Sequence, residues 1–395
     1  MFKSPRSLFL AAGLLAAGCP LTAQQFQSPG RSQFFNRFPN LEFTNQFNPA
    51  FGVVLDGFFD YRIRDADDAA DFGLRIMELN VAGAIDPDTW GYVALVSENA
   101  EAPEIEEAAV VFDKIPGNFE IKAGRFFVDF GKLMQMHLEE LRTFDRPLPL
   151  REFLGEELGG VGVQFDRWFP VSDTTPMRFS VGIFSSLVSE SHEEEGGDEG
   201  PEAEAVGVKG LDDLSLSARL TSMTDIGDNG LLQGGVSMRH LPNFGFSQAG
   251  IEATELSSTT LGLDVTYQYT SNSGQSQLLL GGEYLQIDGD LAGALDDPMT
   301  PTTMNVNNDT ASGFYVFADY QWDQWNSAGI QFAQTEELAD TSEDASELDF
   351  YYSYMPNELR RFRVGLTVVD AEEDEERLYV QITNFVGAHS HATKW

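Results

Sequence analysis

Hydrophobic and polar residues alternate along most of the chain with a period of two, which predicts many antiparallel strands. In the clearest segment, Thr260, Gly262, Asp264, Thr266 and Gln268 separate the apolar positions Leu261, Leu263, Val265, Tyr267 and Tyr269. The same pattern recurs near 51–61, 77–81, 90–96, 105–115, 177–183, 214–220, 314–322, 362–368 and 378–382. Weaker segments lie near 230–239, 276–286, 326–333 and 347–354. With two strands that flank a long insert, the count is about sixteen strands, with about fourteen or eighteen as alternatives.

Three features favour a membrane barrel over a soluble sandwich. Aromatic residues end several apolar faces, as at Tyr320/Trp322 and Tyr352/Tyr354, where an outer-membrane barrel carries its girdles. Charges stand at mid-strand on the opposite face, which suits a watery lumen. Short turns at 86–88, 115–118, 271–274 and 355–358 alternate with longer loops at 188–211, 241–257, 288–309 and 335–346. The fold class is therefore all-β, a transmembrane antiparallel β-barrel with both termini periplasmic. We expect its apolar faces, including Trp90, Tyr92, Ala94 and Val96, to meet lipid.

One connection is too long to be an ordinary exposed loop. It occupies 126–157, between strands near 119–124 and 161–165, and mixes apolar residues such as Phe126 and Leu154 with charges of both signs. A segment of this composition needs surroundings that offer water to its charges and packing partners to its apolar side chains. The sequence therefore predicts that it is the third external loop, folded into the lumen as a constriction.

Four short motifs lie in this region: Gly124-Arg125-Phe126, Phe130-Gly131-Lys132, Asp145-Arg146-Pro147 and Phe153-Leu154-Gly155-Glu156. The chain ends on FVGAHSHATKW, with Gly387, Ala388 and His389. In these two stretches the sequence resembles a family of porin-like outer-membrane proteins, some of which are described as zinc-regulated TonB-dependent outer-membrane receptors. A TonB-dependent receptor needs a plug domain and about 22 strands, and residues 24–48 are too few for a plug. The resemblance therefore implies a porin-like barrel without a plug.

The N-terminus predicts secretion. Lys3 and Arg6 precede an apolar run that is too short to span a bilayer, followed by LTA before Gln24. This divides the chain into a signal peptide (1–23), an irregular N-terminal arm (24–48) and the barrel (49–395). Lipidation of Cys19 is the alternative processing. After the signal peptide the sequence contains no run of about eighteen apolar residues, so it predicts no membrane-spanning helix.

Charge limits the partners. The formal net charge is −39, from 63 acidic and 24 basic residues, which argues against nucleic acid and favours cations. On the lumen face the two signs are nearly balanced: Lys122, Arg178, Arg219, Arg239, Arg361 and Arg363 against Glu120, Asp166, Asp264, Glu283, Asp319 and Asp349. The excess negative charge therefore belongs to loops and turns, above all the acidic external loop at 188–211.

Candidate pore-lining residues at the constriction are Arg142, Asp145, Arg146, Arg151 and Glu152, whose charges would choose among solutes. Alternatively, Asp145 and Arg146 pair with the barrel wall and only hold the loop. Arg361 and Arg363, two apart on one face, are candidates for binding an anion or for pairing with lumen carboxylates. Weak metal candidates are His389 with His391, and His192 among the carboxylates of the acidic loop.

The sequence carries no motif for a cofactor, and no Gly-x-Ser-x-Gly elbow accompanies His240, so we expect no enzyme activity. The leading hypothesis is an outer-membrane channel for passive diffusion of small hydrophilic solutes or ions, with a mild cation preference. The alternative is a closed or narrow barrel that captures metal or serves a binding or structural role. Expected partners are outer-membrane lipids and lipopolysaccharide, the barrel-assembly machinery and small solutes, and a homotrimer is left open.

Overall fold

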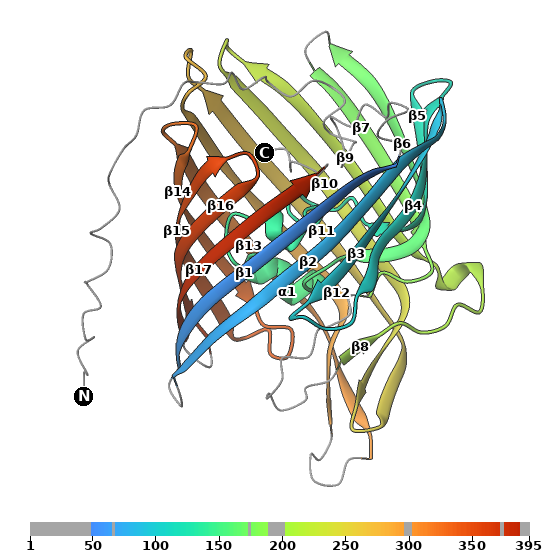
Figure 1. Ribbon diagram of the computed structural model, residues 1–395. Helices are drawn as coiled ribbons and strands as arrows, with labels where there is room; N and C mark the ends of the chain where they lie inside the picture. The colour runs from blue at the N-terminus through green and yellow to red at the C-terminus, as the bar shows by residue number, and fades with distance from the viewer. Residues whose placement is uncertain are drawn as a thin grey trace.

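The computed structural model describes residues 49–64, 68–172, 175–188, 202–295, 302–371 and 375–387. Within them, seventeen strands form one sheet, and all except the short β8 (Glu202–Glu204) close into a sixteen-stranded antiparallel barrel (Figure 1). The first and last strands pair from Gly52–Gly387 to Arg64–Glu375 and complete the wall. A closed wall leaves no unpaired edge, as a membrane-spanning sheet requires. The predicted architecture and strand number are confirmed.

The barrel strands follow one another around the wall in chain order. They are β1 (Ala50–Arg64), β2 (Ala69–Asp86), β3 (Thr89–Glu98), β4 (Glu104–Ile115), β5 (Phe119–Phe127), β6 (Gly159–Ser172), β7 (Thr175–Phe184), β9 (Ser215–Ile226), β10 (Gly230–Gln248), β11 (Ile251–Thr270), β12 (Gln277–Leu295), β13 (Met304–Gln321), β14 (Asn326–Glu336), β15 (Asp344–Asn357), β16 (Arg360–Asp370) and β17 (Glu375–Gly387). The short β8 pairs with the far end of β10, outside the barrel proper.

Side chains alternate between lipid and lumen as the period-two pattern requires. On β11, Leu261, Leu263 and Val265 are 49–57% exposed on the outer face, whereas Asp264 and Thr266 are at most 2% exposed on the inner face. Because the outer face carries the apolar residues and the inner face the polar ones, this wall is built for a bilayer outside and a polar interior.

Helical structure is confined to short segments. Helix α1 (Leu148–Leu154) and a 3₁₀ turn at Leu138–Glu140 lie in the connection between β5 and β6, and a second 3₁₀ turn spans Leu211–Asp213. Neither α1 nor any other helical segment in the described ranges has the length and hydropathy of a bilayer-spanning helix.

The expected orientation of β3 is wrong. Trp90, Tyr92 and Ala94 are 1–8% exposed, and Trp90 and Tyr92 pack in one cluster with apolar side chains of the connection between β5 and β6. An apolar face therefore points inward here, because a packed segment inside the barrel offers it a dry contact surface. Period-two alternation identifies the strand but does not decide which face meets lipid.

Two of the expected long loops are largely strand. Residues 241–257 form the far half of the β10–β11 hairpin, which turns through Ala249 and Gly250, both with positive φ. In the 288–309 region, β12 continues to Leu295 and β13 begins at Met304. The backbone pairing continues in these extensions, but their apolar side chains do not form a lipid-facing row. Leu241, Phe244 and Leu291 are buried in the interior cluster instead.

Several predicted segments lie outside the described residues. These are the signal peptide, the N-terminal arm, most of the acidic loop at 188–211, and the histidines His192, His389 and His391.

The lipid-facing assignment of β11 predicts the effect of a buried charge. Leu263 lies midway along the part of β11 that belongs to the barrel, so L263R is expected to lower the free energy of unfolding by about 2–4 kcal/mol. S273R, in the exposed β11–β12 turn, is the matched control and should change it by less than about 0.5 kcal/mol. Equilibrium denaturant unfolding in phospholipid vesicles measures both values, and equal stabilities for the two variants would contradict the assignment.

Candidate functional site

The connection between β5 and β6, residues 128–158, lies inside the barrel, with α1 in its C-terminal half (Figure 1); we call it the insert. Apolar side chains along its length are at most 1% exposed: Val128, Phe130, Met134, Leu141, Leu150, Leu154 and Leu158. They form one cluster with inward-facing apolar residues of the wall, among them Trp90, Phe244 and Leu285. Part of the lumen is therefore a packed core, and the insert is a structured element of it.

Two glycines of the wall allow the insert to pack closely against it. A Cβ atom on Gly262 of β11 would come 2.9 Å from the ring of Phe130, and one on Gly313 of β13 would come 2.7 Å from Cβ of Pro149. Both contacts are shorter than normal packing allows, so the insert can approach the wall this closely only where a side chain is missing.

Arg361 and Arg363 of β16 bind the main chain of the insert. The Arg363 guanidinium donates to the carbonyl oxygens of Leu141 at 2.5 Å and Thr143 at 2.9 Å, and that of Arg361 donates to the carbonyl of Glu139. Both arginines, proposed from sequence as an anion site or as partners of lumen carboxylates, are occupied instead by backbone carbonyl groups.

Arg178 and Arg219, on β7 and β9, converge on Asp129 at the start of the insert. Arg178 pairs with Asp129 and with Asp166, the latter at 2.9 Å. Arg219 lies 3.4 Å from Asp129 and 2.8 Å from Asp264. The four predicted lumen residues Arg178, Arg219, Asp166 and Asp264 thus form one buried network through an insert carboxylate that was not predicted as a site residue.

The two neighbouring insert residues Asp145 and Arg146 have different surroundings. Asp145 is 28% exposed at its side chain and pairs with Arg377 at 2.5 Å and with Arg75 at 3.6 Å. Arg146 is fully buried and donates to the carbonyl oxygens of Leu133, Met136 and Glu156. Asp145 therefore fastens the insert to the wall, and Arg146 does not face the channel, because it holds the fold of the insert from within.

Other predicted residues also fasten the C-terminal half of α1. Arg151 forms an ion pair with Glu347 of β15, and the Glu152 carboxylate accepts the N–H of Leu338 at 3.0 Å. Arg239 of β10, which is 4% exposed, donates to the carbonyl of Phe153 at 2.9 Å.

Several of the predicted charged residues keep partial exposure. The Arg142 guanidinium lies 5.4 Å from the Phe317 ring, and the Lys122 ammonium lies 4.3 Å from the Phe126 ring. Asp319 is half-buried on the inner face of β13. The other partly exposed members of the predicted set are Glu120, Asp145, Arg151, Glu152 and Arg361.

The environment of the insert shifts the pKa of several groups. Burial alone would raise the pKa of Asp145, but Arg377, Arg75 and Arg151 hold it below its usual range. Burial lowers the pKa of the Lys132 ammonium to about 7, and Asp264 only partly opposes this effect. An insert lysine that can lose its proton near neutral pH contributes less positive charge to the interior than the number of basic side chains suggests.

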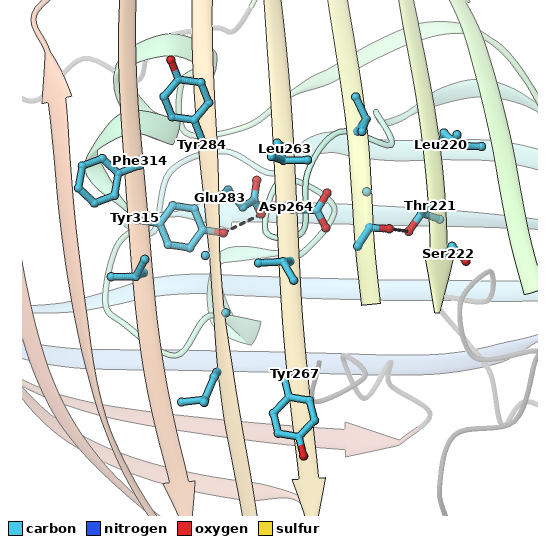
Figure 2. Close-up of a pocket in the computed structure, with 18 of the residues that line it drawn as sticks. Leu220, Thr221, Ser222, Leu263, Asp264, Tyr267, Glu283, Tyr284, Phe314 and Tyr315 are labelled. Atoms are coloured by element: carbon cyan, nitrogen blue, oxygen red, sulfur yellow. Dashed lines mark hydrogen bonds between the residues drawn. The ribbon is translucent and has the colours of Figure 1, made fainter. Parts of the chain in front are cut away.

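Glu283 of β12 is an anchor whose role the sequence did not show. Its carboxylate accepts the N–H groups of Lys132 at 2.5 Å and Leu133 at 3.2 Å. It also accepts the hydroxyl of Tyr315 at 2.6 Å, as Figure 2 shows beside Asp264. Alternation predicted the inward orientation of Glu283, but the partner is about 150 residues away in sequence.

The hollow drawn in Figure 2 belongs to the outer face of the same strands. Gly234 and Gly282 interrupt the outward row of apolar side chains there, between Leu220, Leu263 and Tyr284. This shallow apolar groove faces the bilayer and is separate from the channel.

A further group of buried side chains was not singled out from the sequence. His137 of the insert lies against Glu78 of β2 and Glu106 of β4, with Glu139 of the insert beside them. The residues come from three distant parts of the chain, so no local sequence motif predicts this group.

No family model matches the sequence. An uncharacterised protein of Aquifex aeolicus (strain VF5) is 26% identical over 342 residues, which cover 81% of this chain and 69% of that protein.

Solved structures of outer-membrane proteins share the fold. The OprB structure of Pseudomonas putida aligns with a TM-score of 0.55 at 10% identity over 86% of this chain and 94% of that one. An anion-selective porin from Comamonas acidovorans gives 0.53 at 12% identity, over 85% and 98% of the two chains. A trimer form of Vibrio cholerae OmpT gives 0.53 at 10% identity, over 85% and 98%. The fold is that of a bacterial outer-membrane porin barrel.

The buried position of Arg146 predicts that its substitution makes the insert easier to cleave. R146K keeps the charge but loses the planar fork that reaches three carbonyls, and hydrogen bonds from a charged donor contribute about 1.5–3 kcal/mol each. Loss of one of them should raise the rate of proteinase K cleavage within the insert by roughly 10–100-fold, while the barrel keeps its resistance to unfolding in detergent. R142K, at a partly exposed site of the same insert, is the control and should cleave like wild type. Equal cleavage of the two variants would show that Arg146 does not hold the insert.

Proposed function

We propose that this protein is not an enzyme but a porin-like channel, which lets small hydrophilic solutes or ions diffuse passively across the outer membrane. In this proposal the barrel supplies the passage and the insert narrows it. The concentration gradient of the solute drives transport.

The main support is the chemistry of the interior. A barrel wall with no role in passage could have a wholly apolar core, yet here charged residues stand on the inner face from β1 to β17, for example Asp60, Asp264 and Arg377. These buried residues are paired. Other charged residues of the interior, such as Arg142, Asp145 and Asp319, keep partial exposure, which supports water in part of the lumen.

The insert is suited to act as a filter because its partly exposed charges differ in sign. Asp145, Arg142 and Arg151 all belong to it, and Lys122 and Asp319 stand on the wall. Fixed charges of both signs at a narrow point create a transverse field, which selects solutes by their charge and dipole.

We further propose a mild cation preference that arises at the external mouth. The formal net charge is −39, while the described arginines of the lumen are paired with carboxylates or carbonyls. The Comamonas porin with the same fold is anion-selective, so the fold does not decide the sign of selectivity. The charge of this chain favours cations.

A homotrimer is the assembly we propose, on the model of the trimer form of Vibrio OmpT. The wall of this chain is continuous within one protomer, so each protomer would carry its own passage.

The packing of the insert favours a second candidate, a barrel closed by its own insert that binds a ligand or has a structural role. Apolar side chains from both halves of the insert belong to the buried cluster that also includes wall residues. In that case an inserted barrel would pass no current.

Conductance separates the two candidates. The purified, refolded protein in a planar bilayer is expected to give stepwise current, and a silent but correctly inserted barrel would favour the closed alternative. R363Q removes the guanidinium that holds Leu141 and Thr143, so it should raise the unitary conductance and the open-channel noise. R360Q, an exposed arginine of the same strand that bonds Asn384, is the matched control and should leave both unchanged.

Selectivity tests the origin of the cation preference. Six acidic residues lie in 190–201: Glu190, Glu193, Glu194, Glu195, Asp198 and Glu199. Replacing them by Gln and Asn should shift the reversal potential in a salt gradient toward zero. The shift should be large near 10 mM salt, where charges act over about 30 Å, and small near 1 M, where they act over about 3 Å. An unchanged reversal potential at low salt would rule out mouth charge as its cause.

A further inference from the structure

Four buried polar side chains meet where the insert touches β2 and β4. His137 is 4% exposed, and its neighbours Glu78, Glu106 and Glu139 are between 2% and 5% exposed. Nδ1 of His137 lies 2.9 Å from a carboxylate oxygen of Glu106 and 3.1 Å from one of Glu78. Candidate ligand atoms of Glu78, His137 and Glu139 all lie within 4.8 Å of one another.

The charges of this cluster are poorly balanced by the protein itself. Neither Glu78 nor Glu139 forms a salt bridge with a lysine or arginine in the described part of the chain. Arg361 reaches the main-chain carbonyl of Glu139 and not its carboxylate. Two buried carboxylates that share one imidazole are unfavourable without a further positive charge.

Unpartnered atoms point into the same space. Nε2 of His137 has no hydrogen-bond partner among the described residues, and Nδ1 and the Glu78 oxygen that faces it have only the contact that requires a protonated imidazole. Buried polar atoms in native proteins are nearly always satisfied. The cluster therefore has the features of a site that is completed by something other than a protein side chain.

We propose that Glu78, His137 and Glu139, with Glu106 as a fourth ligand, bind a divalent transition-metal cation such as Zn²⁺. An imidazole nitrogen with carboxylate oxygens is a donor set that zinc accepts. In a tetrahedral site with bonds of about 2.1 Å, ligand atoms lie about 3.4 Å apart. The observed separations of 2.9 and 3.1 Å would widen by a few tenths of an ångström, and the wider ones would contract, as small side-chain rotations allow.

The surroundings orient His137 for this role. The 3₁₀ turn at Leu138–Glu140 begins directly after it, and Glu140 closes the turn from both sides: its N–H donates to the His137 carbonyl at 3.1 Å and its carboxylate accepts the His137 N–H at 3.2 Å. The ring packs against Phe127, with centroids 5.1 Å apart. Because Glu78 and Glu106 belong to the wall and His137 and Glu139 to the insert, a bound ion would tie the insert to β2 and β4.

The test measures zinc binding to the full-length, refolded protein in detergent, by competition with a chromophoric chelator after dialysis against ZnCl₂. Wild type is expected to hold one tight equivalent per chain. H137Q and E139Q should each bind at least about 100-fold more weakly, the upper end of what loss of a supporting residue costs. The double variant H389Q/H391Q, which removes two histidines of the C-terminal tail, should keep the tight equivalent.

Two further measurements make each outcome decisive. Heat-modifiable gel mobility shows whether H137Q and E139Q are folded. If H137Q does not fold, E139Q, which preserves the side-chain volume, still tests the proposal. Zinc should also slow proteolysis of the insert in wild type and not in E139Q. The proposal is overturned if wild type holds no tight zinc, if both cluster variants bind as wild type does, or if the tail variant alone loses the site.

Discussion

The structure depends on one constraint: a segment of about thirty residues inside a barrel must have its backbone polar groups satisfied. Its only extended regular element is the two-turn helix α1, so most of its carbonyls need partners from elsewhere. The wall supplies them as guanidinium groups, from Arg239 on one side and Arg361 and Arg363 on another. A planar guanidinium bonds two or three carbonyls at once, which explains why the lumen uses arginine for this purpose.

This use of arginine also separates the charges of the molecule. The chain has 24 basic and 63 acidic residues, and arginines of the wall bind the insert or its carboxylates. Much of the positive charge of the lumen is therefore used in its packed part, and the acidic excess belongs to the rest of the chain. The net negative charge then acts where the chain meets water, and the interior selects by the few charges that remain partly exposed.

Much of the fold was predictable because it is periodic. Leu263 and Asp264 sit on opposite faces for the same local reason as every other pair on β11, and sixteen strands followed from repeating that argument. The prediction failed where a second packed layer changes the rule, as at Trp90 and Tyr92, and at Phe244 in the β10–β11 extension. The contacts of the insert were not predictable: Arg361 reaches a carbonyl 222 residues away in sequence, and His137 meets Glu78 only because the insert folds back against β2 and β4.

The two sides of the insert are fastened by different chemistry, and this difference has a consequence. On the β16 side, guanidinium groups hold carbonyls, and neither partner titrates near neutral pH. On the β2–β4 side, carboxylates meet a histidine, and their attraction depends on a proton or a cation from solution. If the insert loosens under changed conditions, it should therefore part from β2 and β4 first and remain attached to β16. The insert would then move away from β2 and β4 while it stays attached to β16, which lies only three strands from β2 around the wall.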